Sequence, residues 1–353
     1  MGERILEVRN LCTSFFTHEG EVKAVNDVSF HIDEQEIVAF VGESGCGKTV
    51  TQLSLLQIVP APPGKITGGE VFFKGRDLLQ HKPNSPEMRS VRGAGIAMIF
   101  QEPMTSLNPV FTVGHQLTDI IMLHRKVGHK EAWEMGIEAL RSVEIPEPEV
   151  RMRNYPFELS GGMRQRVMIA MAVYCNPDII IADEPTTALD VTTQAQVLEL
   201  LVSLVKQHRK SLIIVTHNLG VVTRYVDRIY VMYAGRIIES GSTEEIMTKP
   251  RHPYTIGLLN SVPKIEKERS EKLIPIKGAP PWLIDMDPRC TFLPRCSYAC
   301  EVCETKEFPK LRRLGESDHF IACHRDIAGS ITGSTTGRLD SAGRHDLGGE
   351  AHG

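Results

Sequence analysis

The chain has 353 residues, a hydrophobic content of 41% and a formal net charge of −4 at pH 7. This length suffices for one large domain with an appendage or for two domains, and the acidic balance gives no electrostatic reason to expect nucleic acid as a partner. The opening MGERILEVRN has no apolar stretch typical of a secretion signal, and no apolar run reaches the ~18 residues of a membrane-spanning helix. We therefore expect a cytosolic protein, in which clustered cysteines indicate a metal site more than disulfides.

Residues 1–248 alternate short apolar runs with longer mixed segments, as the strands and helices of an α/β domain do. A parallel-sheet core is expected, because four runs rich in β-branched residues are almost continuously apolar. A β-hairpin is expected around Ala234 and Gly235. Helical patterns over about 85–160 predict a helical insert. The four predicted strands are residues 36–42, 95–101, 178–184 and 211–217.

The composition changes from residue 249. Prolines recur over 250–281, four cysteines lie between Cys290 and Cys303, and a fifth follows at Cys323. We expect a small Cys-rich region over 249–326. Residues 327–353 are rich in Gly, Ser and Thr with almost no large apolar side chains, so this tail is predicted to be disordered.

The segment GESGCGKT matches the phosphate-binding pattern G-x-x-x-x-G-K-[ST] and lies between a predicted strand and a helical segment, where such a loop is required. Its glycines allow backbone N–H groups to turn toward phosphate oxygens, and the following helix adds a favourable dipole. Lys48 can reach the β- and γ-phosphates, and the Thr49 hydroxyl can bind Mg²⁺. Cys46 is interpreted as a small filler residue and not as a nucleophile. The loop residues expected at the nucleotide are Gly42, Ser44, Gly45, Cys46, Gly47, Lys48 and Thr49.

A second element, IIIADE, places Asp183 and Glu184 at the end of a predicted strand. Asp183 suits the Mg²⁺ shell, directly or through water, and Glu184 is placed to orient or deprotonate an attacking water. An acidic pair at a strand end can also merely cap a following helix. The phosphate-binding loop upstream favours the metal and water roles.

The string LSGGM, residues 159–163, closely resembles the LSGGQ signature of ABC-type ATPases. It begins a predicted helix, so Ser160, Gly161 and Gly162 can present N–H groups and a hydroxyl to a γ-phosphate. The resemblance implies a parallel-sheet core with an antiparallel β subdomain and a helical subdomain. It also implies that the signature binds ATP held by a partner subunit, so hydrolysis requires a head-to-tail dimer.

Further elements resemble the same family and follow in order. Gln101 corresponds to the Q-loop glutamine, and the ALD string, residues 188–190, resembles the D-loop and adds Asp190 to the nucleotide site. His217 resembles the switch histidine that contacts the γ-phosphate, although a histidine at a strand end is more often structural. The resemblance thus implies that the catalytic residues are Glu184, His217 and Gln101, and that Thr49, Gln101 and Asp183 hold Mg²⁺.

One aromatic residue near the start is a candidate for stacking on adenine. Phe15 falls where the family places that aromatic, with Phe16 as the alternative. Either side chain could instead belong to the core of a strand.

Two strings, FQEPMTSLNPVFTVG and HPYTIGLLNSVP, look like those of peptide/nickel importer ATPases, and LSGGMRQRVMIAMA looks like the D-type subunit of dipeptide and oligopeptide permeases. This resemblance implies ATP-driven import of di- or oligopeptides. The implied partners are an F-type ATPase subunit, two membrane permease subunits and, indirectly, an external solute-binding protein. The chain would lie at the cytoplasmic face of the membrane. Import of nickel or another small solute by the same architecture is the alternative.

Two details concern those partners. The EPMTSLNP segment after Gln101 is expected to contact a permease coupling helix, because Pro103 and Pro109 limit its conformations. Met163 stands where the signature usually has glutamine, so the two composite ATP sites can differ in activity.

The clustered cysteines fit the same family. Peptide-importer ATPases of this type often carry four cysteines that bind a [4Fe–4S] cluster, and the set here resembles that pattern, although four thiolates also suit Zn²⁺. Cys300 is a departure, because it creates the C-x3-C-x2-C spacing of radical-SAM enzymes; the complete ATPase upstream argues against that class. Buried or disulfide-forming thiols are a further alternative, and the expected role of a cluster is structural. The expected cluster ligands are Cys290, Cys296, Cys303 and Cys323.

Two other classes of function compete with peptide import. A soluble ABC ATPase acting on DNA or ribosomes usually has two cassettes or a long coiled coil, and the sequence shows neither. An Fe–S redox enzyme with a nucleotide-binding domain would turn over without ATP. We therefore expect a transport ATPase without a nucleic-acid partner, whose transported substrate is set by other subunits.

Overall fold

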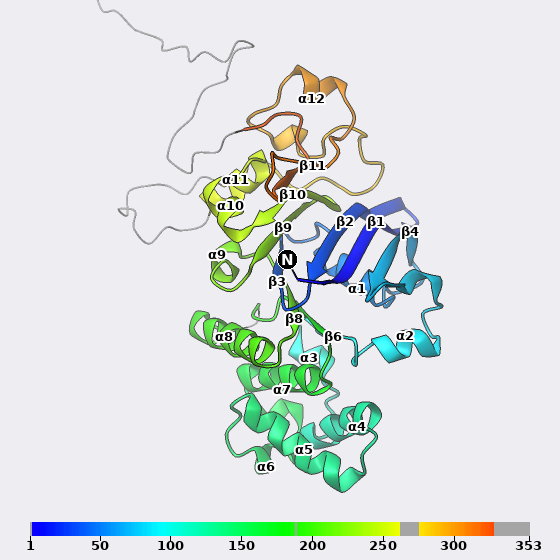
Figure 1. The fold of residues 1–353 in the computed structure, drawn as a ribbon, viewed down its shortest axis with the longest axis vertical. Coiled ribbons are helices and arrows are strands. Elements are labelled where there is room, and N and C mark those ends of the chain that lie inside the picture. Colours follow the sequence, from blue (N-terminus) through cyan, green and yellow to red (C-terminus); the bar gives the residue numbers. More distant parts are fainter. Residues whose placement is uncertain (1, 188, 262–274, 328–353) are drawn as a thin grey trace, which may run out of the picture.

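The computed structural model describes residues 2–187, 189–261 and 275–327. The predicted disordered tail lies outside them from residue 328 onward, as does Ala188 of the ALD string. The described chain forms a central sheet, a second sheet beside it, a helical lobe at one end and the Cys-rich region at the other (Figure 1). The α/β fold expected from the sequence is therefore confirmed.

The central sheet has eight strands in the order β11-β12-β10-β9-β3-β8-β7-β6. Strands β9, β3, β8, β7 and β6 pair in parallel, and the four apolar runs predicted as buried strands are all among them. The predicted hairpin is confirmed, since β9 and β10 are antiparallel and both Ala234 and Gly235 have positive φ at the turn. The strands are β3 Ile37–Val41, β6 Ile96–Ile99, β7 Ile179–Asp183, β8 Ser211–Thr216, β9 Arg228–Tyr233 and β10 Arg236–Ser242.

Both faces of the parallel strands are buried, which explains why their sequences are continuously apolar. Successive side chains of a strand point to opposite faces, so Ile37, Ala39 and Val41 join one core whereas Val38 and Phe40 join another. Helices α5, α7 and α8 close the first core, and helix α1 with the second sheet closes the other. These helices are α1 Lys48–Leu55, α5 His129–Ser142, α7 Gly161–Tyr174 and α8 Val191–Gln207.

The second sheet has the order β2-β1-β4-β5 and is antiparallel throughout, as expected for a β subdomain. Leu6, Val8 and Leu11 of β1 are fully buried in the core that this sheet shares with α1. The elements of this part are β1 Arg4–Thr17, β2 Gly20–Asp33, β4 Gly64–Phe73, β5 Arg76–Asp77, η1 Leu78–Gln80 and α2 Pro86–Val91.

A helical lobe lies beyond β6. Helices α4 and α5 pack on each other and on α7, with Leu117, Leu140 and Val167 in their shared core (Figure 1). The range 85–160, expected to be mainly helical, also contains β6 of the central sheet. No helix in the described part of the chain is long and apolar enough to span a membrane. The remaining elements of the lobe are α3 Pro103–Ser106, α4 Val113–Arg125, α6 Pro148–Arg151 and η2 Pro156–Glu158.

The Cys-rich region joins the central sheet at β10, where β12 pairs with β10 and β11 pairs with β12. Glu239 of β10 is fully buried and accepts hydrogen bonds from the backbone N–H groups of Arg251 (2.6 Å) and His252 (2.9 Å). Its Oε1 also lies 2.7 Å from Nε2 of His319. One buried carboxylate thus connects three segments. Helices α9 Leu219–Val222 and α10 Thr243–Thr248 precede this region. The elements of the region itself are α11 Pro253–Asn260, η3 Leu293–Arg295, α12 Glu301–Thr305, β11 Arg312–Arg313 and β12 Phe320–Ile321.

Replacing this carboxylate should destabilise the protein strongly. In Glu239→Ala two buried backbone N–H groups and the buried His319 ring lose their acceptor, so we expect the free energy of unfolding to fall by about 3 kcal/mol. Urea unfolding followed by circular dichroism measures this change. The control Glu244→Ala removes an exposed carboxylate of α10 and should stay within about 0.5 kcal/mol of the unmodified chain. Equal midpoints for the two variants would contradict the proposed role of Glu239.

Candidate active site

The phosphate-binding loop connects β3 to α1 and is pressed against neighbouring backbone. A Cβ atom on Gly42 would lie 2.2 Å from the carbonyl oxygen of Met232, and one on Gly47 would lie 2.2 Å from that of Ala24. Gly47 also has φ 99 where α1 begins, so glycine is needed there for two reasons. Cys46 is buried in the same loop, and burial raises the pKa of its thiol, in keeping with a filler residue.

The side chains of Lys48 and Thr49 hold the loop in place and connect it to β7. The buried ammonium of Lys48 donates to the carbonyl oxygens of Gly42 and Glu43, at 2.8 Å each. The Thr49 hydroxyl donates to Oδ1 of Asp183 at 3.0 Å. Burial raises the pKa of Asp183 to about 6, against the opposing effect of the Thr49 hydrogen bond. A divalent cation would offset the lost hydration of this carboxylate, so the Thr49–Asp183 pair fits Mg²⁺.

Glu184 lies at the centre of a hydrogen-bonded group at the same edge of the sheet. Its Oε2 accepts from Gln101 Nε2 (3.0 Å) and from the Thr187 hydroxyl (2.8 Å), and its Oε1 lies 3.2 Å from Nδ1 of His217. The Glu184 backbone has φ 44, a costly conformation for a non-glycine residue, and its N–H donates to the Val215 carbonyl oxygen. The three residues expected to be catalytic are therefore in contact.

Thr187 is a member of this group that the sequence reasoning missed. Its hydroxyl lies three residues after the carboxylate that it contacts, in the string EPTT. A hydroxyl at that spacing after an acidic strand end is the only signal that the sequence offers, and it is too common to identify a site alone.

The signature residues lie apart from the phosphate-binding loop. Ser160 caps α7 with its side chain, and Gly161 and Gly162 face the start of α8, where a Cβ on Gly162 would lie 3.1 Å from Thr193 Cγ2. Asp190 caps α8 by accepting from the Thr193 N–H at 3.0 Å. In the described part of the chain no hydrogen bond joins residues 160–162 to the loop. The signature and the phosphate-binding loop therefore form two separate groups in the described part of this chain.

The candidate adenine contact is on β1. Phe15 is half-buried, and a Cβ on Gly64 of the neighbouring β4 would lie 3.0 Å from its ring. Phe16 follows it on the other face of the strand and is 51% exposed. Stacking of Phe15 on adenine stays a prediction.

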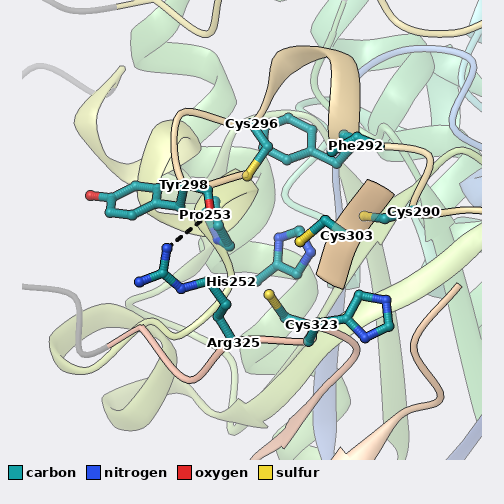
Figure 2. A pocket seen from close by; sticks show the side chains of 11 residues that line it. His252, Pro253, Cys290, Phe292, Cys296, Tyr298, Cys303, Cys323 and Arg325 are labelled. Carbon is teal, nitrogen blue, oxygen red and sulfur yellow. Dashed lines mark hydrogen bonds between the residues drawn. The ribbon is translucent and has the colours of Figure 1, made fainter. Parts of the chain in front are cut away.

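Four of the five C-terminal cysteines line one cavity (Figure 2). The lining includes Cys290, Cys296, Cys303 and Cys323, while Cys300 lies beside it with its Sγ 3.6 Å from that of Cys303. Burial raises the pKa of all four lining thiols, that of Cys296 to about 12. Among the described residues no group of three or more His, Cys, Asp or Glu side chains is arranged to hold a metal ion.

His252 lines the same cavity, and no role for it was predicted from the sequence. Its Nδ1 accepts the backbone N–H of Tyr254 at 3.1 Å, which leaves the proton of a neutral ring on Nε2. Burial lowers the pKa of His252 to about 4, so the ring is neutral at pH 7. Figure 2 shows this ring beside the cysteine side chains. The string HPY, residues 252–254, is the only feature of the sequence that singles out this histidine.

The fold, the phosphate-binding loop and the signature together define a nucleotide-binding domain of the ABC type. The chain is similar to a dimeric structure of MJ0796, a bacterial ABC transporter cassette, with a TM-score of 0.60 and 28% identity over 67% of this chain and 98% of that one. It is also similar to cbiO1 from Clostridium perfringens, with a TM-score of 0.58 and 25% identity over 69% of this chain and 90% of that one.

Sequence comparison defines the family more closely. Residues 25–187 match the family described as ABC transporter, and residues 238–303 match the one described as oligopeptide/dipeptide transporter, C-terminal region. The Bacillus subtilis oligopeptide transport ATP-binding protein OppD is 49% identical over 90% of this chain and 88% of its own length. The dipeptide transport ATP-binding protein DppD of that organism is 49% identical over 91% and 94%. The chain belongs to the family of peptide ABC transporter ATP-binding proteins.

The contacts of Glu184 predict a separation between binding and hydrolysis of ATP. Glu184→Gln keeps the side-chain size and an oxygen for Thr187 but loses the base, so hydrolysis should fall by about 100-fold or more while ATP binding is retained. Phosphate release and equilibrium binding of labelled ATP measure the two effects. Glu199→Gln, which changes an exposed carboxylate of α8, should alter neither. Full hydrolysis by Glu184→Gln would exclude this residue as the base.

Proposed function

We propose that this chain hydrolyses ATP to power the import of di- or oligopeptides through membrane permease subunits. The observation that carries the proposal is the convergence of Lys48, Thr49 and Asp183 with the Gln101–Glu184–His217 group at one edge of the sheet. The peptide-transport names of relatives at 49% identity support the substrate class. Import of nickel or another small solute is the second candidate, and the resemblance to peptide/nickel importer ATPases supports it.

The side chains have distinct roles in this reaction. The N–H groups of the loop and the Lys48 ammonium hold the phosphates. Mg²⁺, when bound by Thr49, Asp183 and Gln101, neutralises charge that develops on the phosphates. Glu184 orients the attacking water and accepts its proton, and His217 contacts the γ-phosphate.

The partner in hydrolysis is a second ATPase subunit of the F type. Gly161 and Gly162 lie against Leu189 and Thr193, and Ser160 caps α7. These signature residues would bind ATP held by a partner in a head-to-tail dimer. The similar cassette MJ0796 has a dimeric structure, which supports pairing of two such domains. Met163 in place of the usual glutamine makes the two composite sites chemically different.

Two permease subunits are the second kind of partner, with a solute-binding protein delivering substrate on the outside. The segment after Gln101 leads into a surface of the helical lobe that exposes apolar side chains. Val110 is 70% exposed and Phe111 44% exposed, and the ring of Phe111 stacks on His115. Exposed apolar side chains on the segment that follows Gln101 suit a coupling helix from a permease at the cytoplasmic face.

The docking proposal predicts uncoupling by a change in this segment. Glu102 is exposed at the start of α3, next to Gln101. Glu102→Ala should therefore leave basal ATP hydrolysis by the pair of ATPase subunits unchanged but lower peptide uptake by about fivefold in proteoliposomes holding the full complex. Glu87→Ala, a matched change at the start of α2, should alter neither. Loss of ATP binding in Glu102→Ala would contradict the docking role, and recovery of nucleic acid in place of permeases from a pull-down would contradict the transport function.

We also infer that the cysteine cavity holds a [4Fe–4S] cluster. The four lining thiols are soft ligands, and their pKa values are raised by burial that iron would compensate. Cys290, Cys296, Cys303 and Cys323 would hold the cluster, since all four line one cavity. A cluster would stabilise this region structurally.

Metal and sulfide analysis after anaerobic purification tests the cluster. We expect about four irons and four sulfides per chain with broad absorption near ~400 nm. Cys323→Ser should lose most of this iron, because Cys323 lines the cavity, whereas the matched variant Cys300→Ser should keep it. A content of one zinc ion per chain without sulfide would contradict the cluster and indicate a zinc site, with Cys300 as a candidate ligand.

A further inference from the structure

Arg295 connects the Cys-rich region to the phosphate-binding loop. It ends the short helix η3, directly before Cys296, and its guanidinium donates two hydrogen bonds to the carboxylate of Glu43, from Nη1 to Oε2 at 2.7 Å and from Nη2 to Oε1 at 2.9 Å. Its Nε donates to the Lys277 carbonyl oxygen at 2.9 Å, and its Nη1 reaches the Tyr233 hydroxyl at 3.3 Å. The side chain is only 5% exposed, so this fork is held in one orientation.

Glu43 is the second residue of the phosphate-binding loop and is held at three points. Arg295 binds its side chain, its backbone N–H donates to the Tyr254 hydroxyl at 2.8 Å, and its carbonyl oxygen accepts from the Lys48 ammonium. Two of these three contacts come from beyond residue 250, outside the nucleotide-binding motifs. The conformation of the loop beside the phosphate-binding lysine therefore depends on the C-terminal region.

The charge of Glu43 gives the contact an electrostatic consequence. A carboxylate within a loop that binds a polyanion repels that ligand unless a cation neutralises it. Arg295 supplies this cation, and the hydrogen bonds to Glu43 raise the pKa of the guanidinium, which stays charged. Phe292, next to η3, packs against Tyr233 and keeps the region in place.

We propose that Arg295 is a positioning residue for ATP binding, which neutralises Glu43 and holds the phosphate-binding loop from the C-terminal region. The inference deepens the proposed ATPase function, on which its kinetic readout rests, and it does not depend on a metal cluster. Ion pairing that merely anchors the C-terminal region would change stability without changing nucleotide affinity. The two roles therefore differ in a direct binding measurement.

The test uses the full chain and measures Kd for MgATP with a fluorescent ATP analogue, with urea unfolding in parallel. Arg295→Met should weaken ATP binding by about fivefold or more, because an unpaired carboxylate then lies within the loop that binds the triphosphate. The control Arg313→Met removes an exposed arginine of the same region, paired with Asp318, and should keep the original Kd. In the reconstituted complex the KM for ATP should rise for Arg295→Met with little change in kcat.

Two further variants separate the loss of charge pairing from a loss of stability in Arg295→Met. Adding Glu43→Gln to Arg295→Met removes the unpaired charge and should restore most of the lost affinity. Arg295→Lys keeps the positive charge but not the two-point contact with Glu43. Its Kd for MgATP should lie between those of the unmodified chain and Arg295→Met. Unchanged affinity in Arg295→Met, or a double variant no better than the single one, would overturn the proposal. Binding without hydrolysis in every variant would instead count against the proposed ATPase function alone.

Discussion

Parallel pairing of β3, β8, β7 and β6 is the constraint on which the rest of this protein depends. Parallel strands in one register end at a common edge, as the pairing of Val41 with Thr216 and of Asp183 with Val215 shows. The phosphate-binding loop follows β3, Glu184 follows β7 and His217 follows β8. Side chains more than 130 residues apart in the chain thus meet within hydrogen-bonding distance, as Thr49 and Asp183 do.

The same pairing explains how the other parts are attached. Because both faces of the parallel strands are apolar, each face needs a cover, and the helices on one side and the second sheet on the other supply it. The signature begins α7, which packs against the helical lobe, and makes no hydrogen bond to the phosphate-binding loop among the described residues. The edge at β10 is covered by β12, so the C-terminal region extends the nucleotide-binding sheet.

Because β12 extends the central sheet, residues of the C-terminal region contact the phosphate-binding loop. Glu43 belongs to the loop, yet Arg295 and Tyr254 hold it from beyond residue 250. Glu239 of β10 also holds this region, because its buried carboxylate accepts hydrogen bonds from two backbone N–H groups at the start of the region. The cysteine cavity therefore lies on a region that is held to the nucleotide-binding domain by charged contacts as well as by apolar packing.

The sequence by itself determined four strands of the central sheet and the β9–β10 hairpin, because β-branched apolar runs and turn residues depend on near neighbours in the chain. Motifs with local spacing likewise predict the residues of the nucleotide site. The family resemblance named Gln101, Glu184 and His217, and the structure shows that they are in contact. Only the tertiary structure decided the roles of Thr187 and His252 and the Arg295–Glu43 pair. An ion pair across 252 residues leaves no local pattern, since the partners meet only after the sheet and the C-terminal region have packed together.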